Sequence, residues 1–257
     1  MPFVTNDGCE IWYEEHRGKG PILVYISGYM GISSIWDPLI AKLGDKYRHI
    51  VHDNRGYGRS SKPESDAVYT IPRHADDLAA ILEALHIKDR VVLVTHSMGG
   101  NIATDFHLKY PGRVAGIVYA AAYYDGKRFS KLGATPRLLA ENADSPSKSA
   151  DHFVGQGLPY GIAIEAAKWP PHGRRNNAKG LLEYEIGNEY SEITVPTLAV
   201  HGDVDKTTPH ESLVKPMVDA LPNSKLVLLK GVNHFPQVEA TEDFSQLVED
   251  FVISISM

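Results

Sequence analysis

The stretch VVLVTHSMGG, residues 91–100, decides the fold of this chain. Its first five residues are apolar or β-branched and predict a short buried strand. A helix is predicted from Met98 to Lys109, and Ser97 lies in the tight turn between the two. Such a turn lifts the serine hydroxyl above the carboxyl edge of a sheet, where it can act as a nucleophile. A serine that only caps a helix would leave a similar pattern, but the strand–turn–helix context favours a nucleophile.

Outward from this stretch, short apolar runs alternate with helical patterns. Further strands are predicted at Ile22–Ser27, Tyr47–His52, Val114–Ala122, Thr197–Val200 and Lys225–Leu229. Residues 73–86 repeat apolar positions at helical spacing, and Leu247–Ile255 form a predicted last helix. The alternation predicts an α/β fold, with a mostly parallel central sheet and helices on both faces.

Residues 123–190 interrupt the alternation. They contain glycine and proline clusters at 155–159 (GQGLP) and 169–173 (WPPHG), with short helical pieces such as 162–168. A segment of this length is rarely plain loop in a compact domain. We therefore predict a helical cap over residues 123–190, inserted into a core domain made of residues 1–122 and 191–257.

Composition excludes several classes of protein. The chain has 257 residues, of which 43% are hydrophobic and 23% charged, as in ordinary globular proteins. A net charge of −6 without a basic run predicts no nucleic-acid partner. No signal peptide and no apolar stretch of membrane-spanning length are apparent, and Cys9 is the single cysteine. We expect a cytoplasmic protein without a membrane partner; both a monomer and a homodimer stay open.

A serine nucleophile needs a histidine to take its proton and a carboxylate to orient that histidine. In sheets of this kind the three follow in the order serine, acid, histidine. His234 comes after the predicted strand 225–229, which places it at the same edge as the serine. His201 precedes every nearby acid, and His210 follows Asp205 by only five residues, so neither suits the role.

The loop HGDVD, residues 201–205, offers two acids. Asp205 lies further into the loop, where its carboxylate can turn towards His234. Asp203 is better placed to accept backbone N–H groups of the turn. The predicted catalytic residues are therefore Ser97, Asp205 and His234, and this set requires neither a metal nor an organic cofactor.

Acyl transfer also needs donors for the oxyanion. The predicted donors are the backbone N–H groups of Met98, directly after the nucleophile, and Tyr29, between two glycines after the strand 22–27. A plain glycine turn is the alternative for the second. Predicted substrate contacts are Gly28, Tyr29, Met98, Tyr123, Tyr124 and Trp169. Packing of the cap on the sheet would explain its aromatic residues equally well.

Four segments, in this order, resemble the α/β-hydrolase superfamily, in particular its capped lipase, esterase and lactonase-like members. Residues 53–60 match D-x-R-G-x-G-x-S, 95–99 resemble G-x-S-x-G, 196–209 resemble the segment with the family acid, and 231–239 that with the histidine. Thr95 replaces the first glycine of the serine motif. The family's usual His-Gly-x-Pro reads Ser-Gly-Tyr-Met at 27–30, which disfavours an epoxide hydrolase.

The resemblance implies a serine hydrolase that cleaves an ester or lactone of a moderately apolar small molecule through an acyl-enzyme on Ser97. Two alternatives stay open. One is a C–C bond hydrolase or perhydrolase with the same triad, and the other is a non-hydrolytic ligand receptor of this fold. For Asp53 and Arg55 we predict a structural role below the site.

Overall fold

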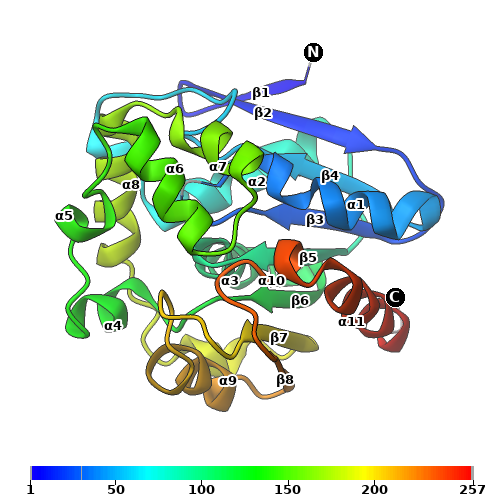
Figure 1. The fold of residues 1–257 in the computed structure, drawn as a ribbon. Coiled ribbons are helices and arrows are strands. Elements are labelled where there is room, and N and C mark those ends of the chain that lie inside the picture. Colours follow the sequence, from blue (N-terminus) through cyan, green and yellow to red (C-terminus); the bar gives the residue numbers. More distant parts are fainter. Residues whose placement is uncertain (1, 30, 256–257) are drawn as a thin grey trace.

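The central feature of the computed structural model is one mostly parallel sheet, and residues 2–29 and 31–255 are described (Figure 1). The strands are β1 (Phe3–Asn6), β2 (Cys9–His16), β3 (Ile22–Ile26), β4 (Arg48–His52), β5 (Val91–His96), β6 (Val114–Ala120), β7 (Thr197–Gly202) and β8 (Ser224–Leu229). Their order is β1-β2-β4-β3-β5-β6-β7-β8. The pairs β1–β2 and β2–β4 are antiparallel, and all other neighbours are parallel.

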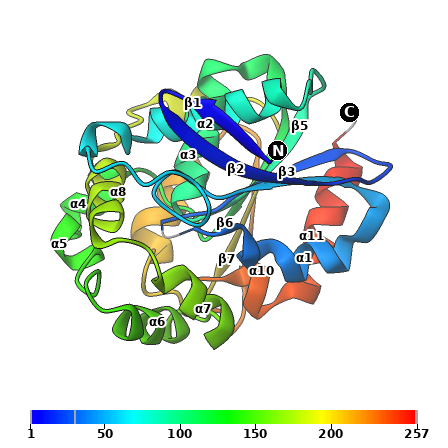
Figure 2. The same cartoon turned by 90° about the horizontal axis from the view of Figure 1, so that it is seen from above.

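Helices cover both faces of this sheet. They are α1 (Asp37–Leu43), α2 (Ile71–Ala84), α3 (Met98–Lys109), α4 (Gly126–Lys131), α5 (Pro136–Leu139), α6 (Pro146–Gly155), α7 (Tyr160–Ala167), α8 (Pro171–Glu183), α9 (Lys215–Ala220), α10 (Pro236–Glu239) and α11 (Thr241–Ser254). One face packs on α2, α3 and α9, and the other on α1 and α11 (Figure 2). The predicted fold class is confirmed.

Burial on both faces explains why the central strands are apolar at nearly every position. In β3, Val24 faces the α2–α3 side and Tyr25 the α1–α11 side, and both are fully buried. Successive side chains of a strand point to opposite faces, so a sheet covered twice needs apolar residues throughout. Strands β1 and β2, at one end of the sheet, are more polar and more exposed, which is why no such run marks them in the sequence.

Several boundaries differ from the sequence predictions. The strand predicted to reach Ala122 ends at Ala120, and Ala121 has a positive φ of 46°. The last helix begins at Thr241, six residues before the predicted start; its added first turns expose Glu242, Asp243 and Gln246 and bury Phe244 and Ser245. Helix α3 has the predicted bounds.

Between β6 and β7, where every residue is described, the chain forms helices and turns and no strand. Helices α4 to α8 lie together beyond the carboxyl ends of the parallel strands (Figure 1). The division of the chain into a core domain and a cap at residues 123 and 190 stays a prediction.

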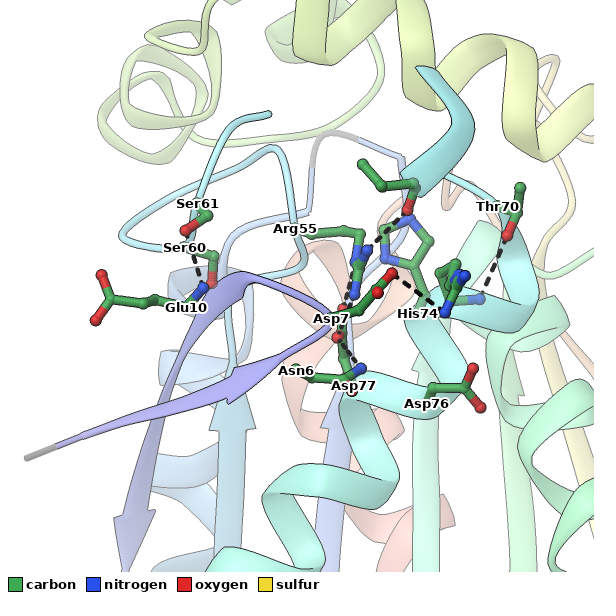
Figure 3. Close-up of polar contacts among 12 residues, drawn as sticks. Asn6, Asp7, Glu10, Arg55, Ser60, Ser61, Thr70, His74, Asp76 and Asp77 are labelled. Atoms are coloured by element: carbon green, nitrogen blue, oxygen red, sulfur yellow. Dashed lines mark hydrogen bonds and ion pairs between the residues drawn. The ribbon is translucent and has the colours of Figure 1, made fainter. Parts of the chain in front are cut away.

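Arg55, in the loop after β4, and Asp77, in α2, form a buried ion pair (Figure 3). The guanidinium donates to both carboxylate oxygens at 2.6 and 2.7 Å, and also to the carbonyl of Val68 at 3.0 Å. Asn6 donates to the same carboxylate at 2.8 Å, so β1, the loop after β4, and α2 meet here. Asp53 similarly accepts N–H groups of neighbouring loops.

Candidate active site

Ser97 occupies the turn between β5 and α3 with φ 51° and ψ −121°. A positive φ is uncommon for a residue with a side chain, and such strain gathers at functional sites. The Ser97 N–H donates to the carbonyl of Ala120 at 2.9 Å, which fixes the turn to β6. Gly99 allows the close approach, because a Cβ there would lie 2.2 Å from the Ile26 carbonyl oxygen. The turn therefore presents the hydroxyl at the carboxyl edge of the sheet.

His234 and Asp205 meet Ser97 from the loops after β8 and β7. Nδ1 of His234 is 2.8 Å from Oδ2 of Asp205, and Nε2 is 3.2 Å from Oγ of Ser97. A carboxylate only accepts hydrogen bonds, so Nδ1 carries the proton and Nε2 accepts from the serine hydroxyl. All three side chains are buried. The structure thus places the three predicted catalytic residues in one hydrogen-bonded chain.

The carboxylate of Asp205 is held by several donors. Besides His234, it accepts from the hydroxyl of Thr208 at 2.8 Å and from the N–H groups of Thr207 and Thr208 at 2.7 and 3.2 Å. Burial alone would raise the pKa of Asp205, but His234, His201 and Thr208 hold this pKa well below its ordinary value. Asp203 accepts instead from the N–H of Gly231 at 2.6 Å, so the two acids of this loop have different tasks.

The two predicted oxyanion donors flank the serine. Neither the N–H of Tyr29 nor that of Met98 donates to another group within residues 2–29 and 31–255. Met98 is the first residue of α3, so its N–H has no partner inside the helix. The Tyr29 loop lies against Ser97, because a Cβ on Gly28 would lie 2.8 Å from Cβ of Ser97. Their assignment as an oxyanion hole stays a prediction.

A cavity of about 880 Å³ opens over Ser97 and His234. Most of its wall is apolar, including Phe129, Ala134, Leu138, Leu139, Leu181 and Phe235. Its polar lining residues, besides Ser97 and the histidines next to it, are His152, Gln156, Lys206, Thr207 and Asn233. The lining within the described chain includes no aspartate or glutamate. A carbonyl compound with an apolar body fits this mixture, since ligand pockets combine apolar walls with a few polar groups.

Only some of the predicted substrate contacts line this cavity. Tyr29 and Tyr123 line the cavity. The side chain of Met98 is buried in the core on the α2–α3 side, so only its backbone is available. Tyr124 lies outside the lining, because its hydroxyl donates to the Gly187 carbonyl at 2.7 Å.

Two further predicted contacts are also absent from that lining. Gly28 touches Ser97 beneath the cavity, and Trp169 packs against the core on the α1–α11 side. Met30, in the predicted oxyanion loop, falls outside the residues that the structure describes.

Sequence reasoning missed three residues that surround His234: His96, Gln156 and Glu239. His96 precedes Ser97 directly, and its position at the end of β5 was the available signal. Gln156 carries no such signal, because its contact to the loop of His234 joins segments distant in the sequence. Glu239 lies only four residues after Phe235, within the segment 231–239, and this closeness was its available signal.

No three or more histidine, cysteine, aspartate or glutamate side chains in the described part of the chain are grouped so as to hold a metal ion. Over the same residues, every helix is too short or too polar to cross a membrane.

Known proteins similar to this chain have the same fold. A family model described as the alpha/beta hydrolase fold matches residues 21–159. The chain is 28% identical to a non-heme haloperoxidase from Rhodococcus erythropolis, over 91% of this chain and 93% of that protein. It is 26% identical to a bifunctional esterase/perhydrolase from Acinetobacter calcoaceticus, over 92% and 94% respectively.

A solved structure, that of Est816, described as an N-acyl homoserine lactone degrading enzyme, superposes with a TM-score of 0.84. It is 28% identical, and the match covers 97% of this chain and all of that one. With the sheet order, the serine turn and the matched segment in agreement, the chain belongs to the alpha/beta hydrolase fold family.

Proposed function

We propose that the protein is a serine hydrolase that cleaves a carboxylic ester or lactone of a moderately apolar small molecule. The hydrogen-bonded chain from Ser97 through His234 to Asp205 supports this proposal most directly. It ends beside a cavity whose wall is mainly apolar, which suits the body of such a substrate.

In the proposed reaction the Ser97 oxygen attacks the substrate carbonyl while Nε2 of His234 takes its proton. Asp205 stabilises the imidazolium that forms. The N–H groups of Tyr29 and Met98 bind the oxyanion, and loss of one such donor typically costs about 100-fold or more in rate. His234 then returns the proton to the leaving alcohol. Water, activated by the same histidine, cleaves the acyl-enzyme and releases the acid.

The test compares wild-type protein with Ser97→Ala on p-nitrophenyl acetate and butyrate. We expect turnover by the wild type and a fall of roughly 1,000-fold or more in the variant. Ser245→Ala is the matched control, since this serine is also buried but lies in α11, where it donates to the Glu242 carbonyl. Equal rates for wild type and Ser97→Ala would contradict the proposal.

The similarity to an esterase/perhydrolase favours one further use of the same acyl-enzyme. Hydrogen peroxide in place of water would release the acyl group as a peracid and regenerate the Ser97 hydroxyl. Peracid formation from acetate esters and peroxide, lost in Ser97→Ala, would support this activity. Ester hydrolysis without any peracid at high peroxide concentration would exclude it.

A further inference from the structure

The backbone of the loop that carries His234 is held by two side chains, one from Glu239 in the helix that follows the loop and one from His96, distant in the sequence. Glu239 accepts the N–H groups on either side of the histidine, from Asn233 at 2.9 Å and from Phe235 at 2.8 Å. A carboxylate that accepts two N–H groups makes charge-assisted bonds, which are stronger than neutral ones. Both neighbours of His234 are therefore tied to one point.

His96 holds the carbonyl of the same residue. Its Nε2 lies 2.8 Å from the His234 carbonyl oxygen, and because a carbonyl only accepts, Nε2 donates. The His96 ring also stacks on Phe235, with ring centres 4.6 Å apart and an angle of 23°. Burial, and the neighbouring His234, lower the pKa of His96 to about 3, so this donor stays neutral in ordinary buffers.

The residue His96 is also close to the turn of Ser97 and to the loop of Tyr29. It directly precedes Ser97, and a Cβ on Gly28 would lie 3.1 Å from its Nδ1. His96 is thus joined to the turn of Ser97 through the backbone, and its buried ring lies close to the loop of Tyr29 and contacts the loop of His234.

The helical segment between β6 and β7 also contacts the loop that carries His234. The N–H of His234 donates to the carbonyl of Gln156 at 3.2 Å, and the Asn233 side chain donates to the carbonyl of Gly155 at 3.1 Å. The side chain of Gln156 in turn donates to the hydroxyl of Thr207 at 2.8 Å. The end of α6 therefore bridges the loops that carry His234 and Asp205.

We propose that His96 and Glu239 are positioning residues that set the distance between Nε2 of His234 and Oγ of Ser97. The inference rests on the proposed function, in which His234 is the base. Asp205 fixes the imidazole at Nδ1, and the backbone contacts fix it at the Cα end. With both ends held, Nε2 lies 3.2 Å from the serine oxygen. A shift of about 1 Å in such a contact can cost on the order of 100-fold in rate.

The readout is the rate at which Ser97 reacts with diisopropyl fluorophosphate, followed by the mass of the intact protein. In this reaction the serine oxygen bonds to phosphorus, fluoride leaves, and the proton goes to His234. The rate needs no knowledge of the natural substrate. Since it is measured per folded molecule, lower stability alone does not change it, and kcat per titrated site provides a second measure.

For His96, the informative pair is His96→Phe and His96→Gln. Phenylalanine keeps an aromatic ring without the donor, whereas glutamine places an N–H group near the position of Nε2. We expect His96→Phe to react about 10 to 100 times more slowly than wild type, and His96→Gln to stay within about threefold. His74→Phe is the control: this buried histidine also forms a hydrogen bond through Nε2, to the side chain of Asn177, but is not among the residues that line the cavity.

For Glu239, we compare Glu239→Ala with Glu242→Gln. The second residue is an exposed glutamate on α11 that pairs with Lys42 at the surface. Removal of the Glu239 carboxylate should slow the reaction of Ser97 about 10-fold. The control should react as the wild type does. Glu239→Gln, which keeps one oxygen acceptor, should fall between Glu239→Ala and the wild type, and it covers the case in which the alanine variant does not fold.

The outcomes separate the two proposals. If wild-type Ser97 is not modified, the proposed function fails and the inference fails with it. If wild type reacts and both His96→Phe and Glu239→Ala react equally fast, only the inference is overturned. A His96→Gln variant as slow as His96→Phe would likewise overturn the role of the donor at His96.

Discussion

Two buried carboxylates of this protein, Asp77 and Asp205, are almost equally shielded from water but lie in different settings. Asp77 accepts hydrogen bonds from two nitrogens of the Arg55 guanidinium and from Asn6. These bonds join structural loops and do not lead to the cavity. Asp205 is bound by His234, whose second nitrogen faces Ser97 and the cavity. A closed network holds loops together, whereas a network with one open end can pass a proton to a substrate.

The largest expected effect lies in the open network. Asp205→Asn should lower kcat/KM on p-nitrophenyl butyrate by about 10⁴, because the asparagine no longer holds His234 in the required tautomer. Asp203→Asn is the control from the same loop and should keep most of the activity. If the two variants had equal activity, Asp205 would not be the acid.

The closed network should show the opposite effect. Asp77→Asn leaves Arg55 as a buried charge without its carboxylate, which typically costs about 3–5 kcal/mol of stability. Urea unfolding measures this loss, while kcat per titrated site should stay within about threefold. Asp66→Asn removes an exposed ion pair with Lys179 and should change stability little. A large loss of kcat in Asp77→Asn would show that the network of Asp77 also contributes to catalysis, and would contradict the distinction between the two networks.

A smaller effect is expected at the contact between the nucleophile and the Tyr29 loop. Gly28→Ala puts a Cβ 2.8 Å from Cβ of Ser97 and 2.8 Å from the carbonyl oxygen of His96, so the loop must shift. We expect kcat to fall on the order of 100-fold, since a displaced amide no longer meets the oxyanion. Gly112→Ala has open space around its Cβ and serves as the control. Unchanged kcat in Gly28→Ala would contradict the assignment of the Tyr29 N–H as an oxyanion donor.

The smallest expected effects concern the dependence of stability on pH. A buried histidine lies near each network: His74 is influenced by Arg55, and His201 lies beside Asp205. Burial, with a contribution from Arg55, lowers the pKa of His74 to about 3. Burial lowers the pKa of His201 to about 4, although Asp205 opposes the shift. An unfolded chain binds protons at both near pH 6.5, whereas the folded chain does not. Unfolding therefore takes up protons from pH 6.5 down to about 4, and stability falls as pH falls.

Each histidine should contribute up to about 1.4 kcal/mol per pH unit in this range. Urea unfolding of wild type, His74→Gln and His201→Gln at pH 7, 6 and 5 measures the slope. In each variant, unfolding should take up about one proton fewer than in the wild type, so the dependence of stability on pH should be weaker. A slope identical to that of the wild type in either variant would show that the histidine concerned is already charged in the folded protein.

The sequence alone determined the alternation of strands and helices and the position of the strand–turn–helix that holds Ser97. Apolar runs such as that in β5 are visible because a sheet covered on both faces buries every position. Strands β1 and β2 escaped prediction because polar residues interrupt them, whereas the edge strand β8 is also partly exposed but keeps the apolar run Leu226–Leu229. The order of Ser97, Asp205 and His234 followed from the connection of the parallel strands, whose carboxyl ends share one edge.

Only the tertiary structure decided which side chains surround that edge. His96 and Glu239 contact the loop of His234 through its backbone, and backbone groups look alike in every sequence. Tyr123 lines the cavity while Tyr124 bonds to Gly187, a difference set by the fold of the following helices rather than by residue type. Periodicity records whether a position is buried, but the partner of a polar group depends on long-range packing, which no local pattern contains.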